Sequence, residues 1–218
     1  MGFLEKFKER YEHDSIKLKI KNREFRFFVP TDIEDFIDPE NPISGFPLWA
    51  KIWEASIVLS DYISNLDPVP HRKILEVGCG LGMVGVIGAY FGHKIIMTDY
   101  NRYALEFAKA NAIANLGDNS HLQILAMDWK NPGLKGRFDM IIGSEIIYKD
   151  SDFDPLRGIM KNYLNQNGQI VMACEYRCSV FDFLHNIKDE FHIKIHKKRL
   201  SSQKKELNLM ICLLRPFL

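Results

Sequence analysis

The chain has 218 residues, of which 46% are hydrophobic and 26% are charged, and its formal net charge is +1. This size and composition are typical of a globular protein with one substantial core, so we expect a single domain. A net charge near zero excludes a protein whose overall field attracts nucleic acid or an anionic membrane. No apolar run approaches the roughly 20 residues of a membrane span. The N-terminus is too charged for a signal peptide, so we expect a soluble cytoplasmic protein.

The first 48 residues are predicted to form an extension in front of a cofactor-binding core at residues 49–218. The opening dozen residues have an amphipathic pattern that predicts a short helix. In residues 15–30, polar and apolar residues alternate on both sides of an Asn-containing turn, which predicts a β-hairpin. Residues 31–47 are acidic and rich in Pro and Gly, which predicts a loop.

The core begins with apolar residues at helical spacing from Trp49 to Leu66, which predict a helix that ends before Asp67-Pro68. Short Val- and Ile-rich stretches then alternate with helical ones, which predicts a parallel sheet with helices on both faces. The predicted strands are residues 73–77, 94–99, 122–128, 138–144 and 169–175, and the predicted helices are residues 83–91, 102–114 and 153–164.

Two further strands are predicted at residues 191–200 and 207–216. The polar linker SSQKKE between them leaves no room for a crossover helix, so the two strands must pair antiparallel. Five parallel strands closed by an antiparallel hairpin resemble the mostly parallel seven-stranded sheet of the Rossmann-like class I methyltransferases. The resemblance implies an α/β fold of that class.

Metal centres are not indicated by the cysteine pattern. The four cysteines form no C-x-x-C pair, a usual zinc spacing, so we expect no metal. Buried reduced thiols are expected instead at Cys79, Cys174, Cys178 and Cys212.

One glycine-rich stretch, ILEVGCGLGMVG at residues 74–85, fits two cofactor patterns. Gly80, Gly82 and Gly85 form the G-x-G-x-x-G of nicotinamide and flavin enzymes. Starting at Glu76, the same stretch forms the E-x-G-x-G-x-G of methyl-transfer enzymes. In both patterns the glycines allow a tight turn and a close approach to the ligand, so they do not identify the cofactor alone.

Acidic residues at the strand ends favour S-adenosylmethionine over a dinucleotide. A pyrophosphate would lie at the positive N-terminus of the next helix, where the carboxylate of Glu76 would crowd it. That carboxylate can instead orient the loop or face the cationic methionyl end of S-adenosylmethionine. Asp99 suits a ribose diol in either case. Asp128 can accept a hydrogen bond from the adenine amine, and Trp129 can cover the adenine ring. A dehydrogenase pattern does not require this pair of residues.

A closer resemblance lies in four motifs. IWEASIVLSDYI, residues 52–63, resembles the W-[DE]-A-[AS]-x-x-L-x-x-Y-[IL] helix of the protein-lysine methyltransferases grouped as methyltransferase family 16. MDW, residues 127–129, and SEIIY, residues 144–148, are similar to the acid-plus-Trp and [DE]-x-x-Y motifs of that family. CEYR, residues 174–177, is similar more loosely to its Tyr/Glu/Arg cluster. The resemblance extends in order from the N-terminal hairpin to the last strand.

The resemblance implies an S-adenosylmethionine-dependent enzyme that methylates a protein side chain, with lysine as the expected acceptor. It implies Glu145 and Tyr148 at the methyl-accepting mouth, as catalytic residues. Many members have Asp where this chain has Glu145, and the longer arm could change the substrate preference. The expected cofactor contacts are Trp53, Glu76, Gly78, Gly80, Gly82, Asp99, Tyr100, Asp128, Trp129 and Ser144. The expected substrate contacts are Trp49, Glu175 and Arg177.

Each of these positions also has a structural interpretation. Asp99 and Asp128 could cap helices, and Trp129 could belong to the core. Glu145 could cap the next helix, and Tyr148 could be a buried ring with a satisfied hydroxyl. The pair formed by residues 175 and 177 could be an ion pair at the rim of the site or a substrate clamp.

Nucleic acid is not the expected substrate, because SEIIY replaces the [DNS]-P-P-[FYW] of base amino-methylating enzymes and no Pro-Cys motif occurs. The basic run at residues 196–206 is more typical of a solvated face than of a phosphate contact.

The acidic residues of the loop at 31–47 could receive a lysine-rich protein or solubilise the chain. We expect a monomer. A small-molecule methyltransferase and a non-catalytic cofactor-binding interaction protein remain as alternatives.

Overall fold

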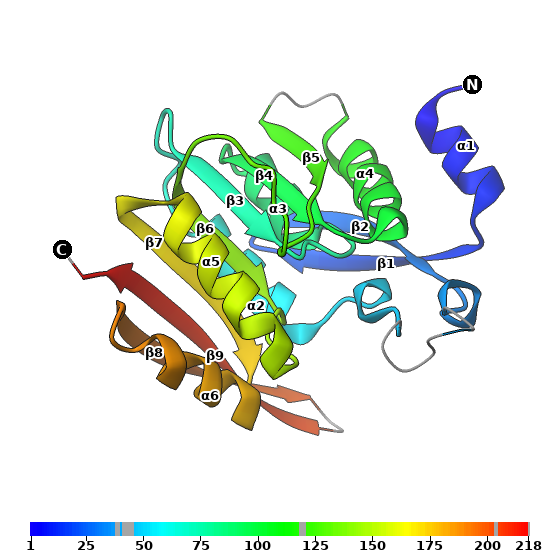
Figure 1. The fold of residues 1–218 in the computed structure, drawn as a ribbon. Coiled ribbons are helices and arrows are strands. Elements are labelled where there is room, and N and C mark those ends of the chain that lie inside the picture. The colour runs from blue at the N-terminus through cyan, green and yellow to red at the C-terminus, as the bar shows by residue number, and fades with distance from the viewer. Residues whose placement is uncertain (38–39, 41–45, 118–120, 203–204, 218) are drawn as a thin grey trace.

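In the part of the chain that the structure describes, seven strands form the central sheet (Figure 1). In sheet order they are β5 (Leu122–Ala126), β4 (Lys94–Asp99), β3 (Lys73–Val77), β6 (Phe138–Ser144), β7 (Leu164–Glu175), β9 (Lys205–Pro216) and β8 (Phe191–Ser202). Neighbours from β5 to β7 are parallel, whereas β9 pairs antiparallel with β7 and β8. The predicted sheet is confirmed. The structure is a computed structural model that describes residues 1–37, 40, 46–117, 121–202 and 205–217.

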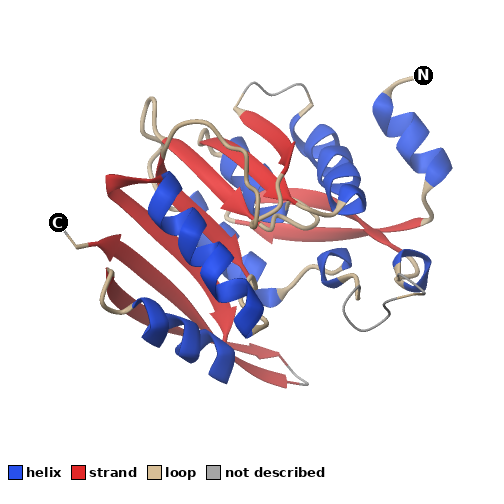
Figure 2. Cartoon of the chain, in the orientation of Figure 1, coloured by secondary structure: helices blue, strands red, loops and turns tan. Residues whose placement is uncertain are grey.

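Both faces of the sheet are covered by helices (Figure 2). Apolar residues of α2 (Glu54–Ser64), α3 (Met83–Tyr90) and α4 (Arg102–Leu116) share one core with one face of the sheet. Those of α5 (Phe153–Tyr163) and α6 (Cys178–Ile187) share another core with the opposite face. Successive residues of a strand point to opposite faces, so Ile74 belongs to the first core and Leu75 to the second. Burial on both faces explains the continuous apolar runs of these strands.

The N-terminal extension consists of α1 (Phe3–Arg10) and a hairpin of β1 (His13–Ile20) and β2 (Arg23–Pro30), as predicted. The hairpin attaches to α4 through two asparagines one helical turn apart. The Asn111 side chain accepts from the Phe28 N–H at 2.6 Å and donates to the Phe28 carbonyl at 3.1 Å. Asn115 makes the same pair of bonds with Arg26, at 2.9 and 2.7 Å. The helix thereby satisfies polar groups on the free edge of β2.

The helix predicted from Trp49 to Leu66 is shorter in the structure. Leu48–Ala50 forms a separate 3-10 turn, and α2 begins only at Glu54 and ends at Ser64. Trp53 is extended at the N-cap, and its indole N–H donates to the Leu48 carbonyl at 2.8 Å. This bond turns the chain back between Trp49 and Trp53. The helical spacing of the apolar residues gives no sign of this turn.

Three further details differ from the predictions. The helix α6 was not predicted, and β7 begins at Leu164 rather than at residue 169, with a register shift against β6 between Phe138 and Met140. Cys178 is exposed because it is the first residue of α6 and lies on that helix's outer side. The other three thiols, at positions 79, 174 and 212, are buried as predicted.

Candidate active site

A cavity of about 420 Å³ opens where the parallel strands β3, β4 and β6 reach their carboxyl ends. Ligand pockets span roughly 300–1,000 Å³, and in parallel sheets they form at this edge, where the strand order reverses. The order reverses beside β3, which lies between β4 and β6. The predicted site residues that line the cavity are Trp49, Trp53, Gly78, Gly80, Asp99, Tyr100, Asp128, Trp129, Ser144, Glu145 and Tyr148.

Asp99, at the end of β4, holds the glycine loop in place. Its Oδ2 accepts the N–H of Gly80 and its Oδ1 accepts the N–H of Asn101, both at 2.9 Å. Burial raises the pKa of Asp99 above its usual value, although these N–H donors act in the opposite direction. Asn101, and not Asp99, caps α4, so the helix-cap interpretation of Asp99 is wrong. Each carboxylate oxygen can accept a further hydrogen bond from a ligand hydroxyl.

The glycines at positions 78 and 80 let the loop form the floor of the cavity. Their φ angles are +66° and +51°, in the left-handed region that glycine adopts without strain. A Cβ on Gly80 would lie 3.3 Å from the Trp49 carbonyl oxygen, and one on Gly78 would lie 3.0 Å from Ile146 and 3.5 Å from Trp129. Side chains here would therefore press into the walls that a bound nucleoside must contact.

Glu76 lies behind the glycine loop and does not line the cavity. Its side chain packs against α3, where a Cβ on Gly85 would come within 2.5 Å of the Glu76 Oε2 and 2.3 Å of Met97. Burial raises the pKa of the Glu76 carboxyl to about 8, and the Gly85 N–H in the first turn of α3 acts in the opposite direction, while Oε2 has no hydrogen-bond partner among the described residues. A carboxyl thus occupies the helix N-terminus at which a dinucleotide pyrophosphate would bind. The last glycine of the G-x-G-x-x-G pattern makes room for Glu76.

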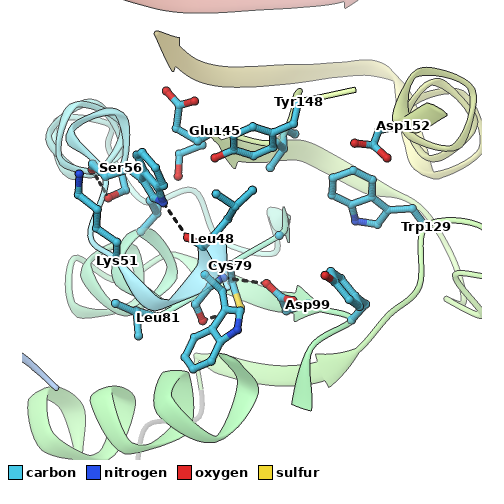
Figure 3. A pocket seen from close by; sticks show the side chains of 18 of the residues that line it. Leu48, Lys51, Ser56, Cys79, Leu81, Asp99, Trp129, Glu145, Tyr148 and Asp152 are labelled. Atoms are coloured by element: carbon cyan, nitrogen blue, oxygen red, sulfur yellow. Dashed lines mark hydrogen bonds between the residues drawn. The ribbon is translucent and has the colours of Figure 1, made fainter. Parts of the chain in front are cut away.

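Aromatic residues form two sides of the cavity. Trp49 is 9% exposed, and its ring packs against Phe36 and Phe107 at centroid distances of 5.1 and 5.5 Å. The Trp53 ring lies 4.6 Å from the Lys51 ammonium. On the opposite side of the cavity, Trp129 lies near Asp152 (Figure 3). The cavity is therefore lined by three indole rings, those of Trp49, Trp53 and Trp129.

Asp128 and Trp129 follow β5 as predicted. Asp128 is exposed, and its Oδ1 accepts the N–H of Lys130 at 2.9 Å, which forms a tight local turn rather than a helix cap. Trp129 is half-buried, lines the cavity and also contacts the second core. Trp129 thus contacts both the core and the cavity, and its contact with the adenine stays a prediction.

Glu145 has an unusual backbone conformation, and each oxygen of its carboxylate has one partner in the protein. Its φ is +51°, a left-handed conformation that is uncommon outside glycine and that often marks functional sites. Its N–H donates to the Ala173 carbonyl at 2.9 Å, and its Oε1 accepts the Glu175 N–H at 2.7 Å. Its Oε2 forms an ion pair with Arg177. Burial raises the pKa of Glu145, and the positive charge of Arg177 opposes this rise.

Tyr148 lies beside Glu145 on the same side of the cavity (Figure 3). The Arg177 guanidinium lies over the Tyr148 ring, 4.8 Å from its centroid. Burial and the neighbouring Glu145 charge raise the pKa of Tyr148, so its hydroxyl stays protonated at neutral pH. Glu145, Tyr148 and Arg177 thus form one cluster, which we call the acceptor triad.

Four predicted site residues lie outside the cavity lining, namely Glu76, Gly82, Glu175 and Arg177. Gly82 makes room for α4, because a Cβ there would lie 2.9 Å from Ala108. The interpretation of Glu175 and Arg177 as an ion pair with each other is wrong, since Arg177 pairs with Glu145 and Glu175 contributes its backbone N–H.

Several residues of the cavity were not predicted. The polar ones are Lys51, Ser56, Lys130, Lys149 and Asp152. Most are close in sequence to a motif: Lys51 and Ser56 flank Trp53, and Lys149 and Asp152 follow Tyr148. Proximity to these motifs was the available signal, but no periodicity separates such residues from ordinary surface charges.

Two features are absent from the described residues, a metal-binding cluster and a membrane-spanning helix. These residues contain no group of three or more His, Cys, Asp or Glu that could hold a metal ion. His192 and His196 have an H-x-x-x-H spacing, but they lie on β8, where four residues span roughly 13 Å. None of the described helices combines the length and apolar character required to cross a bilayer.

Solved structures with the same fold include several methyltransferases. Ribosomal protein L11 methylase from Lactobacillus delbrueckii subsp. bulgaricus has a TM-score of 0.57 and 17% identity, over 75% of this chain and 77% of that one. The magnesium protoporphyrin IX methyltransferase of Synechocystis PCC 6803, solved with bound S-adenosylmethionine, has a TM-score of 0.56 and 13% identity, over 73% and 78% of the two chains. The protein therefore has the class I methyltransferase fold.

Sequence relatives define the family more closely. A family model described as lysine methyltransferase matches residues 47–198. Protein N-lysine methyltransferase METTL21A of Mus musculus is 32% identical over 159 residues, which cover 67% of this chain and 71% of that protein. EEF1A lysine methyltransferase 3 of Mus musculus is 27% identical over 157 residues, which cover 68% and 66%. The chain belongs to the lysine methyltransferase family and is an S-adenosylmethionine-dependent methyltransferase, as the motifs predicted.

A histidine-modifying protein also resembles the chain. Histidine protein methyltransferase 1 homolog of Dictyostelium discoideum is 30% identical over 149 residues, which cover 65% of this chain and 48% of that protein. This chain spans about half the length of that relative. The residue type that receives the methyl group therefore differs among these relatives.

Proposed function

We propose that this protein transfers a methyl group from S-adenosylmethionine to the ε-amine of a lysine in a substrate protein. The observation that supports this most directly is that two sets of residues line the same cavity (Figure 3). Asp99 and the glycine loop form one side, and Glu145 with Tyr148 forms another. One cavity can therefore hold donor and acceptor together, which is the main requirement for an in-line transfer.

The residues present fit the donor. Asp99 offers two carboxylate oxygens to the ribose hydroxyls, and Trp129 with Asp128 offers a ring face and an acceptor to the adenine. Lys51 lines the same cavity and provides a counter-charge for the donor's carboxylate. When bound, the donor supplies an electrophilic methyl group on a sulfonium.

The acceptor triad fits a lysine side chain. A lysine has a pKa near 10.4, so forming its neutral amine at pH 7 costs about 4.6 kcal/mol. Glu145 cannot lower that pKa by itself, because a carboxylate stabilises the ammonium form. Its role in our proposal is to bind and aim the nitrogen, while Tyr148 offers a hydroxyl and a ring face. Desolvation in the buried mouth then favours loss of the proton.

A protein substrate is supported by the relatives, whose names describe protein modification, two of them on lysine. The described acidic residues of the loop before η2 (Leu48–Ala50), namely Asp32, Glu34, Asp35 and Glu40, are exposed, and their charge suits a lysine-rich surface. Asp38 of the same loop lies outside the described residues. We further propose that the enzyme acts in the cytoplasm as a monomer and not on nucleic acid.

A labelling experiment tests the proposal. The purified protein is incubated with methyl-labelled S-adenosylmethionine and a lysate of its own organism that lacks the gene. We expect label in a discrete protein band, with mass spectrometry placing the methyl group on lysine. Label confined to the low-mass fraction would identify a small-molecule enzyme, and label on histidine or arginine would overturn the lysine assignment. Binding of S-adenosylhomocysteine without any label would indicate a non-catalytic binding protein.

A further inference from the structure

The negative charge of the Glu145 carboxylate is already compensated by groups of the protein itself, without a bound acceptor. Glu145 is 7% exposed, and its two oxygens are bonded separately, one by the Glu175 N–H at 2.7 Å and one by the Arg177 guanidinium. Arg177 stands at the N-cap of α6, directly after β7, whereas Glu145 follows β6. Since β6 and β7 are neighbours in the sheet, the ion pair bridges the ends of two adjacent strands.

Arg177 contacts the second acceptor residue as well, because its guanidinium lies 4.8 Å from the centre of the Tyr148 ring. Its own side chain is 28% exposed, and its Nε is buried without a hydrogen-bond partner among the described residues. Arg177 contacts both Glu145 and Tyr148 but does not line the cavity. It therefore affects the acceptor side of the cavity only through its contacts with Glu145 and Tyr148.

Other charged and titratable groups lie around the acceptor triad, and Lys51, Lys130 and Asp152 line the same cavity. Cys174 and Glu175 approach from the end of β7, and burial raises the pKa of the Cys174 thiol so that it stays neutral. From β8, the Lys197 ammonium lies 5.6 Å from the Tyr176 ring. Lys149 follows Tyr148 and is exposed. Arg177 is thus the cation in direct contact with Glu145.

We propose that Arg177 is a positioning residue that neutralises Glu145, so that the mouth can orient an amine without holding it as an ammonium. This inference rests on the proposed lysine acceptor. A lone carboxylate within about 4–6 Å raises the pKa of an ammonium by roughly 1–3 units. In the ion pair with Arg177, most of that effect is cancelled. Glu145 keeps a free lone pair on each oxygen for an N–H of the acceptor.

The main test compares the pH dependence of kcat in Arg177→Gln and wild type, with the labelled substrate protein. We expect kcat at pH 7 to fall about tenfold and the acidic limb to move up by about one pH unit, so that the difference nearly disappears at high pH. The variant Arg177→Lys, which keeps the charge, should restore most of the wild-type profile. A loss that is equal at every pH would indicate a merely structural role and overturn the proposal.

A matched control is available on α5, where Arg157 forms an ion pair with Glu190 that does not line the cavity. Arg157→Gln removes an arginine–glutamate pair of the same kind and should leave the pH profile unchanged. Binding of S-adenosylhomocysteine should be the same in all four proteins. A loss of that binding in Arg177→Gln would mean that the variant disturbs the cofactor side, which contradicts the inference.

A second measurement does not need a protein substrate. Butylamine, which mimics the lysine side chain, is titrated by calorimetry into wild type and Arg177→Gln, each saturated with S-adenosylhomocysteine. We expect wild type to bind it more tightly as the pH rises, and the variant to bind it more tightly at low pH. The same pH trend in both proteins overturns the inference. An absence of protein labelling by wild type would contradict the proposed function, while this titration would still measure the charge of the mouth.

Discussion

The side chain of Asn111 on α4 hydrogen-bonds both the N–H and the carbonyl of Phe28 on β2. Its amide also donates to the Leu81 carbonyl at 2.9 Å. Asn111 is completely buried, so one side chain joins the N-terminal hairpin to the loop that lines the cofactor cavity. The extension is therefore attached to the catalytic core by specific polar contacts and not by apolar packing alone.

Replacement of this residue should destabilise the protein. Asn111→Leu leaves three buried backbone groups without a partner, and we expect the free energy of unfolding to fall by about 3 kcal/mol. Asn115→Leu is the matched control, because the same type of bond to Arg26 lies in a more exposed place and should cost about 1 kcal/mol or less. Urea unfolding measures both. Equal losses would show that burial of these bonds is unimportant.

Asp99 is expected to control donor affinity. Asp99→Ala removes the proposed acceptor for the ribose hydroxyls and frees the Gly80 N–H, so the loop keeps the Cys79 N–H bond to Thr98 but loses the bond to Asp99. A hydrogen bond to a charged group contributes roughly 1.5–3 kcal/mol, which corresponds to a loss of affinity of about 10- to 100-fold. Calorimetric titration with S-adenosylhomocysteine measures the change. An unchanged dissociation constant would remove Asp99 from the cofactor site.

Glu145 is expected to control turnover instead. Glu145→Gln keeps the size of the side chain but replaces one accepting oxygen by an amide NH2 and leaves Arg177 without its ion-pair partner, so we expect kcat to fall by at least about tenfold. Affinity for S-adenosylhomocysteine should stay within about twofold of wild type. Parallel losses of donor affinity in this variant and in Asp99→Ala would contradict the division of the cavity into donor and acceptor sides.

The close approach of Glu76 to α3 predicts a steric effect. Gly85→Ala would place a Cβ 2.3 Å from Met97 and 2.5 Å from the Glu76 Oε2, and such overpacking costs about 1–3 kcal/mol of stability. The control is Gly158→Ala in the middle of α5, where a Cβ meets no atom within 4 Å. Because alanine favours helix, that variant should gain roughly 0.5–1 kcal/mol. Thermal unfolding of the two variants should therefore shift in opposite directions.

Glu76 also predicts a pH dependence of stability. Burial raises its pKa from 4.5 to about 8 in the folded protein, so the folded state keeps a proton that the unfolded state releases. The associated stability is fully present below pH 4.5 and is lost as the pH rises from there to about 8. Glu76→Gln cannot ionise, and its advantage over wild type should grow by on the order of 3 kcal/mol between pH 5 and pH 8. A constant difference in urea unfolding would mean that Glu76 is ionised in the folded state.

The elements of the fold and most of the cavity were predictable because their signals are local. Short segments of the sequence are enough to show that apolar strands alternate with helices. The polar linker between the last two strands permits only a hairpin. Asp99, Trp129 and Tyr148 each end or follow a parallel strand, and such ends meet at one edge of any parallel sheet. Where a local signal misled, as between Trp49 and Trp53, a side-chain bond to the Leu48 carbonyl interrupts the predicted helix.

The sequence by itself determined the order of strands and helices, the cofactor pattern and the residues at the strand ends. Tertiary structure alone decided which side chains meet. Glu145 and Arg177 are 32 residues apart, and they pair because β6 and β7 are neighbours in the sheet. Likewise, Glu76 occupies the N-terminus of α3 because Gly85 leaves a space there. Periodicity describes which face a residue takes, but contacts between distant segments depend on how the layers pack, which no local pattern contains.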